Sequence, residues 1–376
     1  TYGYEEAQAH FERALAANEG QETDAGAAPL LFGLGRTQGA LFQRRDAMDS
    51  LSKAFDHYAD AGDIHGAVSV AEYPINPGVG RVRVTQLISR ALALVPPDSH
   101  QAGNLLSRYC LSLGTELGDH RGAETAFDKA LTIARREGDV ALELRVLANS
   151  ATVDFLHLRW QDCVEKGLRA VALSQRGNGG DPQVEVTARF WAGLALAYIG
   201  DLDGAQQQQT AALFQAEKLR HRGLLSSVLL GKEVIAHLTG DWRSARNFID
   251  QGLAAVAQET RLLSVRVLLE YEVGEFGQGE VYLERLLEVT RRTAPGPTFE
   301  YGLLSIVLPV VACITGAANR EDIAEAAATA ILASPSAIPL FTMYARGGLA
   351  LQAGRRADVA AAPEHYNALG SMESMA

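Results

Sequence analysis

A helical pattern that occurs twice between residues 192 and 256 constrains the fold more than any other feature of this sequence. An apolar helix ends at Gly200-Asp201 and a second helix follows a short turn, and about forty residues later the pattern returns at Gly240-Asp241. Glycine suits the left-handed C-cap of the first helix, and the aspartate can cap the second. Because repeats set architecture before local propensities do, the chain is predicted to be an array of helical hairpins.

The same turn recurs along the middle of the chain, at residues 118, 159, 200, 240 and 274. Most second helices then carry a small, a large and a small residue on one face, as at Ala123, Phe127 and Ala130. Small residues let a neighbouring helix approach closely, and the large residue fills the remaining space. Gln209 departs from this pattern, because it occupies a position where a large apolar residue is usual. Residues 4–18 have the same face, which predicts the second helix of a hairpin.

The fold predicted from these repeats is all-α, a right-handed tetratricopeptide-like α-solenoid of about nine hairpins with a repeat near 40 residues. No sustained alternating pattern predicts a strand. We expect a single superhelical domain over residues 1–376. Prolines and glycines predict an irregular region at 74–98 and a corner near 294–298, and the polar residues 370–376 are expected to fray.

Composition excludes some functions and places the chain in a compartment. With 34 Lys and Arg against 45 Asp and Glu, the net charge is −11, which argues against nucleic-acid binding. Cys110, Cys163 and Cys313 lie far apart and are predicted to be reduced, buried thiols of a cytoplasmic protein. No apolar run approaches the ~18 residues of a membrane span. The chain begins at Thr1 rather than Met, so we expect a piece of a longer protein or a processed start.

Several segments resemble a known family of sensor domains. The chain is similar to the tetratricopeptide-like solenoids that follow the ATPase module in large LuxR-type and maltose-regulator-type transcriptional activators. The segments that carry this resemblance are GYEEAQAHFERALA at 3–16, LLFGLGRTQGALF at 30–42, ISRALALVPPDSH at 88–100, FDKALTIARREGD at 127–139 and LLEYEVGEFGQGEVYLERLLEV at 268–289. The resemblance implies a bacterial solenoid that senses an effector or a partner protein, beside an adjoining ATPase or signalling domain.

Motifs for catalysis or for cofactors are missing from the sequence. It contains no GxSxG, HExxH, CxxC or GxGxxG, and the one Gly-Lys pair, at Gly231-Lys232, does not belong to a Walker A loop. Asp201-Leu202-Asp203-Gly204 begins like a calcium loop but lacks the later ligands. We therefore predict no cofactor, no metal, no catalytic residue and no direct contact with nucleic acid or membrane.

The remaining prediction of a site is geometric. First helices line the concave surface of such arrays, so polar and aromatic residues on them are the default contacts for a ligand or a partner. The predicted contact residues are Arg145, Asn149, Asp154, Arg189, Trp191, Tyr198, Glu233, His237, Arg266, Glu270 and Tyr271. Trp160 and Trp242, which follow the turns, are instead expected to pack between hairpins.

Three functions are compatible with this sequence. The first is a non-enzymatic module that binds a protein segment or a small effector in its concave groove, within a regulator of transcription or signalling. The second is a scaffold or oligomerisation solenoid without a small ligand. The third is an enzyme on an α/α array, with Glu233 or Glu270 as an acid, but no nucleophile or metal set accompanies these carboxylates. The identity of the ligand, the oligomeric state and the pathway are not encoded in any motif.

Overall fold

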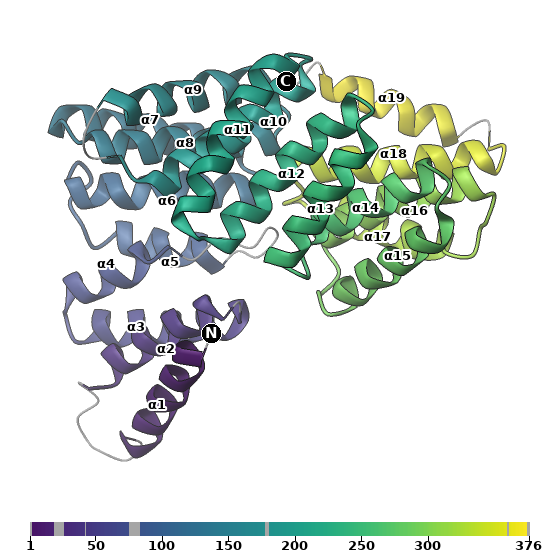
Figure 1. Cartoon of the computed structure of the whole chain (residues 1–376). Helices are drawn as coiled ribbons and strands as arrows, with labels where there is room; N and C mark the ends of the chain where they lie inside the picture. Colours follow the sequence, from purple (N-terminus) through teal and green to yellow (C-terminus); the bar gives the residue numbers. More distant parts are fainter. Residues whose placement is uncertain are drawn as a thin grey trace.

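The computed structural model describes residues 2–18, 26–41, 43–74, 83–176, 180–358 and 361–373. In these ranges every regular element is a helix, so the predicted all-α class is confirmed (Figure 1). The N-terminal half contains α1 (Tyr2–Asn18), α2 (Ala27–Ala40), α3 (Arg44–Asp60), α4 (Ile64–Glu72), α5 (Arg83–Leu92), α6 (His100–Glu116), α7 (His120–Glu137), α8 (Val140–Leu156) and α9 (Trp160–Arg176). The C-terminal half contains α10 (Pro182–Tyr198), α11 (Leu202–Leu219), α12 (Arg222–Leu238), α13 (Trp242–Ala255), α14 (Thr260–Glu272), α15 (Phe276–Arg291), α16 (Phe299–Thr315), α17 (Glu321–Leu332), α18 (Pro339–Arg355) and α19 (Ala361–Glu373).

The helices pair into hairpins in which an even-numbered helix comes first and an odd-numbered helix second. In the described part of the chain, α2 and α3 form the first pair and α18 and α19 the ninth, with α1 packed on α2. Part of the predicted irregular region, residues 75–82, lies outside the described residues, as do residues 374–376 of the predicted tail. The predicted corner separates α15 from α16, and α19 continues through Glu373.

Most turns between paired helices are built as the sequence predicts. Gly118, Gly200, Gly240 and Gly274 have φ between 65° and 91°, the left-handed conformation that ends each first helix. The side chains of Asp119, Asp201 and Asp241 each accept a hydrogen bond from the backbone N–H three residues further along, at 2.8 to 3.1 Å. These bonds satisfy one of the free N–H groups at the start of each second helix.

Two turns depart from the predicted pattern. Glu275 precedes α15 but makes no capping hydrogen bond, so the expectation that an acidic residue caps this helix is wrong. Glutamate is not among the residues preferred at the N-cap position. Between α8 and α9, the left-handed position is taken by Leu158 at φ 63°. A side chain at this φ is sterically unfavourable, which makes this turn the strained member of the series.

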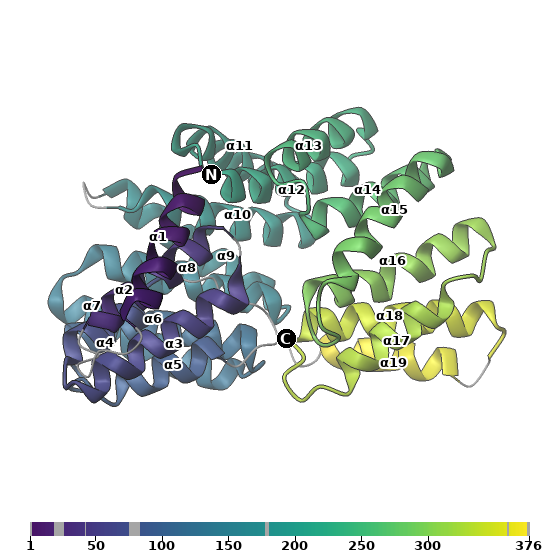
Figure 2. The ribbon, with the colours of Figure 1, turned by 90° about the horizontal axis from the view of Figure 1, so that it is seen from below.

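The first helices form the inner arc of the solenoid. From α6 to α18 each first helix contacts the next first helix, whereas successive second helices from α7 to α19 make at most marginal contact in the described part of the chain. Helices on the inside of an arc are closer together than those on the outside, so the even-numbered helices face the concave side. Seen from below, the helices follow this arc from α1–α9 through α10–α14 to α15–α19 (Figure 2).

The core of the array consists of separate clusters of buried apolar residues that follow one another along the chain. One cluster of buried apolar residues extends from Met48 to Ala188, and a second, which overlaps it along the chain, extends from Ala151 to Ala345. Buried Gln209 is accommodated because Gly193 and Gly231 on the neighbouring first helices leave room for its amide, which donates to the carbonyl of Phe190 at 2.9 Å. The polar exception in the repeat is therefore matched by two glycines.

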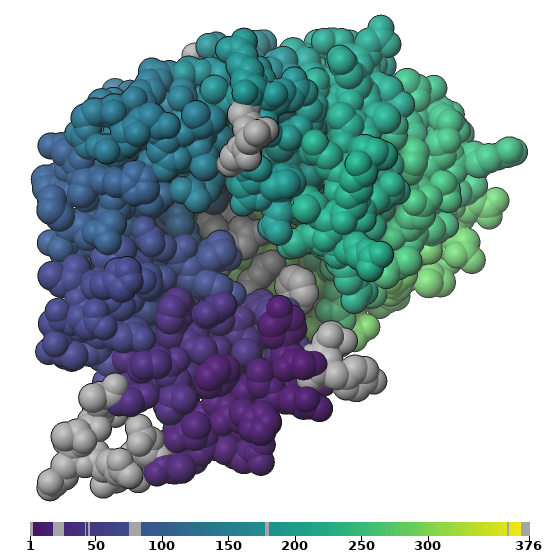
Figure 3. All heavy atoms as spheres, turned by 60° about the vertical axis from the view of Figure 1, so that its left-hand side comes forward, coloured from purple at the N-terminus to yellow at the C-terminus, as the bar shows by residue number. Residues whose placement is uncertain are grey.

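The two arms of the arc meet at one point. A Cβ atom on Gly118, in the turn between α6 and α7, would lie 3.1 Å from the carbonyl oxygen of Ser336, between α17 and α18. The C-terminal hairpins therefore reach across to the first half of the array (Figure 2). In the space-filling view, the surface is hollowed where the N-terminal helices face the green middle part of the chain (Figure 3).

The cysteines divide into two environments. Cys110 and Cys163 are buried, and burial raises the pKa of both thiols, that of Cys110 to about 12. Cys313 is exposed near the end of α16, so the expectation of a buried thiol is wrong at this position. It lies in an apolar helix, but on the side that no neighbouring helix covers.

The length and the polarity of the helices bear on whether any of them could span a membrane. Among the described residues, no helix combines the length and the apolar character needed to cross a lipid bilayer.

Candidate functional site

The predicted contact residues on α8 are used in contacts with the preceding first helix. Arg145 Nη2 donates to Asn104 Oδ1 at 2.6 Å, and Asn149 Nδ2 donates to the carbonyl of Ser107 at 2.9 Å. Both side chains are half-buried, so part of each still faces the concave side. A ligand can contact only those parts of the two side chains that remain exposed once these hydrogen bonds are formed.

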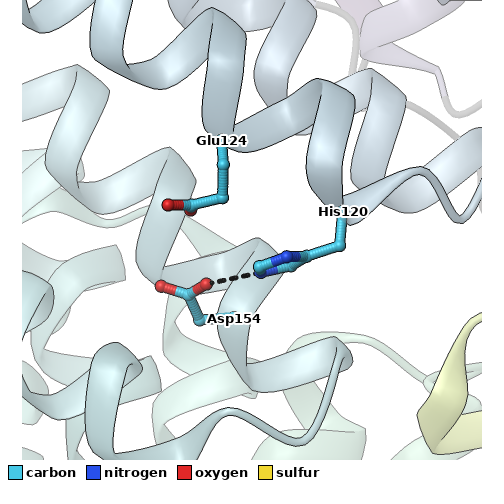
Figure 4. Close-up of side chains that lie close together, drawn as sticks. All are labelled: His120, Glu124 and Asp154. Carbon is cyan, nitrogen blue, oxygen red and sulfur yellow. Dashed lines mark hydrogen bonds and ion pairs between the residues drawn. The ribbon is translucent and has the colours of Figure 1, made fainter. Parts of the chain in front are cut away.

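Asp154, also on α8, lies at the centre of a polar cluster with His120 and Glu124 of α7 (Figure 4). His120 Nε2 lies 3.0 Å from Asp154 Oδ1, and one ligand atom from each of the three residues falls within 4.8 Å of the others. By distance alone, this set could hold a divalent cation. The sequence did not predict it, because His120 and Glu124 come from a second helix.

Lys166 of α9 already supplies a positive charge to this cluster. Its Nζ lies 2.7 Å from Glu124 Oε1 and 2.8 Å from Asp154 Oδ2, and it donates to Ser150 Oγ at 2.9 Å. The contact with Oδ2 is at ion-pair distance without good hydrogen-bond geometry. Burial lowers the pKa of Lys166, but the two carboxylates outweigh burial and raise it, so the ammonium stays charged. A metal ion would have to displace this ammonium, so the cluster fits an ion-pair network better than a metal centre.

The predicted residues on α14 form another internal network. Glu270 is buried and is bridged by Arg246 at 2.6 and 2.9 Å and by Arg266 at 2.6 Å, while Arg266 also reaches Asp250 at 2.6 Å. Burial raises the pKa of Glu270, but the two guanidinium groups outweigh it and lower the pKa. A carboxylate held ionised by two arginines is poorly suited to act as a general acid.

Tyr271 and the polar residue on α10 are also engaged. The Tyr271 hydroxyl donates to Glu280 Oε2 at 2.9 Å, and burial followed by this bond raises its pKa to about 12. Arg189 is buried between Glu185, at 2.8 Å, and Gln208 Oε1, at 2.8 Å. These residues therefore join neighbouring helices.

Aromatic residues gather where α8, α9 and α10 meet. Phe155 lies 4.9 Å from Trp191 and 5.8 Å from Tyr198, measured between ring centroids. Trp160 stacks on Tyr198 with centroids 5.3 Å apart, which confirms that Trp160 packs between hairpins. Trp242 contacts His237 edge-on at 5.2 Å.

Tyr198 differs from the other predicted residues because it is 46% exposed and yet surrounded by protein. Burial, followed by the negative charge of Glu233, raises the pKa of its hydroxyl. Because Tyr198 belongs to a first helix, its exposed part lies on the concave side of the arc. Tyr344 of α18 borders the same place, since burial and then Tyr198 raise its pKa.

Glu233 of α12 lies beside this concavity with its charge incompletely satisfied. It is 1% exposed, and neither carboxylate oxygen has a partner in hydrogen-bond geometry. His237 Nδ1 lies 3.3 Å from Oε1, and His237 Nε2 lies 3.0 Å from Glu272 Oε2. Burial raises the pKa of Glu233, and the nearby carboxyl groups of Glu233 and Glu272 raise the pKa of His237.

We call Trp160, Tyr198, Glu233, His237, Glu272 and Tyr344 the inner cluster. Three of its members, Tyr198, Glu233 and His237, were predicted as contact residues. Tyr344 was missed, although applying the same first-helix rule to the last hairpin would have found it. Glu272 was missed because its role depends on α14 lying beside α12, which the sequence spacing does not specify.

Comparisons with known proteins support the fold. No protein-family model matches the chain, and no curated protein matches it. Among solved structures, the apo form of RapI is similar, with a TM-score of 0.50 and 9% sequence identity, over 92% of this chain and 97% of the RapI chain. Identity this low shows a shared fold only. The chain is thus a tetratricopeptide-like helical solenoid with the architecture of RapI.

Proposed function

We propose that this chain is a regulatory binding module that takes up a small effector or a protein segment on its concave face. The observation that carries the proposal is Tyr198, an aromatic side chain 46% exposed on α10, a first helix of the inner arc. Exposed aromatic side chains in desolvated concavities supply much of the binding energy in recognition sites.

The environment of the candidate residues supports binding rather than catalysis. Glu270 is held ionised between Arg246 and Arg266, which makes it a poor proton donor. We further propose that ligand occupancy is passed to an adjoining ATPase or signalling domain in a bacterial, cytoplasmic regulator. The segments similar to regulator solenoids support this assignment, and the likeness to RapI is compatible with it.

The test is thermal unfolding of the 376-residue chain in the presence of amino acids, nucleotides, sugars, polyamines and short peptides. A ligand that binds the folded state raises the unfolding midpoint by mass action. We expect at least one stabilising compound whose effect is weakened by Arg145→Ala or Asn149→Ala. Phe214→Ala on α11, where Phe214 is 59% exposed on a second helix, is the control and should leave the effect unchanged. The proposal would be contradicted by a compound whose stabilising effect is lost in Phe214→Ala but is unchanged in Arg145→Ala and Asn149→Ala.

A scaffold role remains the second candidate because of one surface feature. Large apolar side chains are exposed near the hairpin turns: Ile199, Leu238, Trp242 and Phe276 are 38% to 53% exposed. Exposed apolar groups of this kind are typical of protein contacts. If light scattering shows self-association that Trp242→Lys abolishes, and no compound stabilises the chain, the scaffold role is favoured over the binding module.

A further inference from the structure

The inner cluster contains a buried carboxyl group that the protein does not fully satisfy. Neither oxygen of Glu233 has a partner in hydrogen-bond geometry, and only 1% of the residue is exposed. Leaving a buried carboxyl group without such partners is costly, so an unsatisfied group of this kind calls for an explanation, and a bound ligand is one. Glu116, an equally buried carboxylate on α6, is by contrast bound by the hydroxyl of Thr85 at 2.7 Å and its N–H at 2.9 Å.

The charges around Glu233 do not balance. His237 lies between Glu233 and Glu272, at 3.3 and 3.0 Å, so a single imidazole faces two carboxyl groups. When all three groups are charged, one negative charge is left over. The side chain of Glu272 is 37% exposed and is solvated, so the deficit falls on the buried Glu233.

The aromatic members of the inner cluster indicate what kind of cation fits. Tyr198 is close enough for the charge of Glu233 to affect its pKa, and it stacks on Trp160. Aromatic side chains beside a carboxylate favour an organic ammonium group, because its charge meets the carboxylate and its methylene groups meet the rings. A bare metal ion would instead require several oxygen ligands, and among the described residues the set whose ligand atoms lie close enough for a metal is His120, Glu124 and Asp154, away from Glu233.

We propose that Glu233, with Tyr198 and Trp160, forms a subsite for a primary alkylammonium group. The inference rests on the proposed binding function and names the chemical class that the concave face takes at this point. The ammonium donates hydrogen bonds to the unpartnered oxygens of Glu233, and its alkyl chain contacts the ring of Tyr198. The group can come from a free diamine or from the lysine side chain of a peptide.

The experiment is calorimetric titration of the whole chain with putrescine and with N-acetyl-lysine methylamide, using 1-butanol as the uncharged control. We expect binding of at least one amine, no binding of butanol, and an affinity about tenfold to a hundredfold lower in Glu233→Gln, as for loss of hydrogen bonds to a charged group. Glu116→Gln removes a carboxylate that is equally buried but partnered, and it should leave the affinity unchanged. Putrescine binding alone indicates a free amine as the ligand, and binding of the lysine derivative alone indicates a peptide.

The stability of Glu233→Gln separates a ligand site from a structural ion pair. If Glu233 is kept for a ligand, the variant without ligand should unfold at the same or a higher temperature than the wild type. Tyr198→Ala gives an independent test and should also weaken amine binding. The inference is overturned if neither amine binds the wild type, or if Glu233→Gln binds amines as well as the wild type. If neither amine binds, but another compound stabilises the wild type and does so less in Arg145→Ala, the ammonium subsite is refuted and the proposed binding function is supported.

Discussion

At the scale of single residues, two glycines distinguish two effects of an alanine substitution: the strain of the backbone conformation and the space available for the side chain. A Cβ atom at Gly200 would meet no atom within 4 Å, and neither would one at Gly354 inside α18. Gly200 has φ +91°, whereas Gly354 is helical. Any difference between alanine substitutions at the two positions therefore comes from backbone conformation.

We expect Gly200→Ala to lower the free energy of unfolding by about 1 to 2 kcal/mol, because alanine is disfavoured in the left-handed region. Gly354→Ala should raise it by up to about 1 kcal/mol, since alanine loses less conformational entropy in a helix. Urea unfolding of the two variants measures both changes. Equal effects at the two positions would show that the turn does not require positive φ.

His157 gives a prediction on pH. It is 8% exposed, its Nε2 lies 2.9 Å from the carbonyl of Gly114, and burial lowers its pKa to about 4. On acidification the His157 imidazole takes up a proton near pH 6.5 in the unfolded chain, but only near pH 4 in the folded chain. The contribution of His157 to stability is therefore complete above pH 6.5 and is lost as the pH falls towards 4.

The expected loss is at most about 3 kcal/mol, the energy of this pKa difference. His157→Gln keeps a donor for Gly114 without a titrating group. The stability of the wild type relative to His157→Gln should therefore decline between pH 6.5 and 4, and urea unfolding at several pH values measures the decline. A constant difference across this range would mean that His157 is not desolvated.

At the scale of the elements, the sequence predicts helices well and contacts between helices poorly. The Gly-Asp turns at 200 and 240 predict where helices end and begin, because capping chemistry is local. Which side chain meets which neighbour depends on how the helices are rotated. For this reason Asp154 was predicted as a ligand contact, while its partner Lys166 on the next helix was not.

The Lys166 network gives a prediction at this scale. The Asp154 side chain is completely buried, so Lys166→Met leaves His120 as its remaining partner and should cost about 3 kcal/mol of unfolding free energy. Adding Asp154→Asn should recover part of this loss. Arg292→Met, which removes an exposed ion pair with Glu288, is the control and should cost less than about 1 kcal/mol. Chemical denaturation gives all three values, and a cost for Lys166→Met as small as that of the control would refute a buried network.

At the scale of the whole molecule, the repeat predicts the solenoid but not how far it curls. Repeats specify contacts between neighbouring hairpins, and these confirm the fold. The contact of Gly118 with Ser336 joins segments that no repeat relates, because it results from small rotations added over many hairpins. The same curling brings Tyr344 close enough for Tyr198 to raise its pKa, and so the inner cluster could be predicted only in part.

Ligand binding on the concave face can be measured by hydrogen–deuterium exchange of the whole chain, with and without a stabilising compound from the thermal screen. We predict that the compound protects amides of the first helices that carry the inner cluster, α10, α12, α14 and α18. Protection confined to the second helices α11, α13 and α15, which carry no member of the inner cluster, would contradict binding on the concave face.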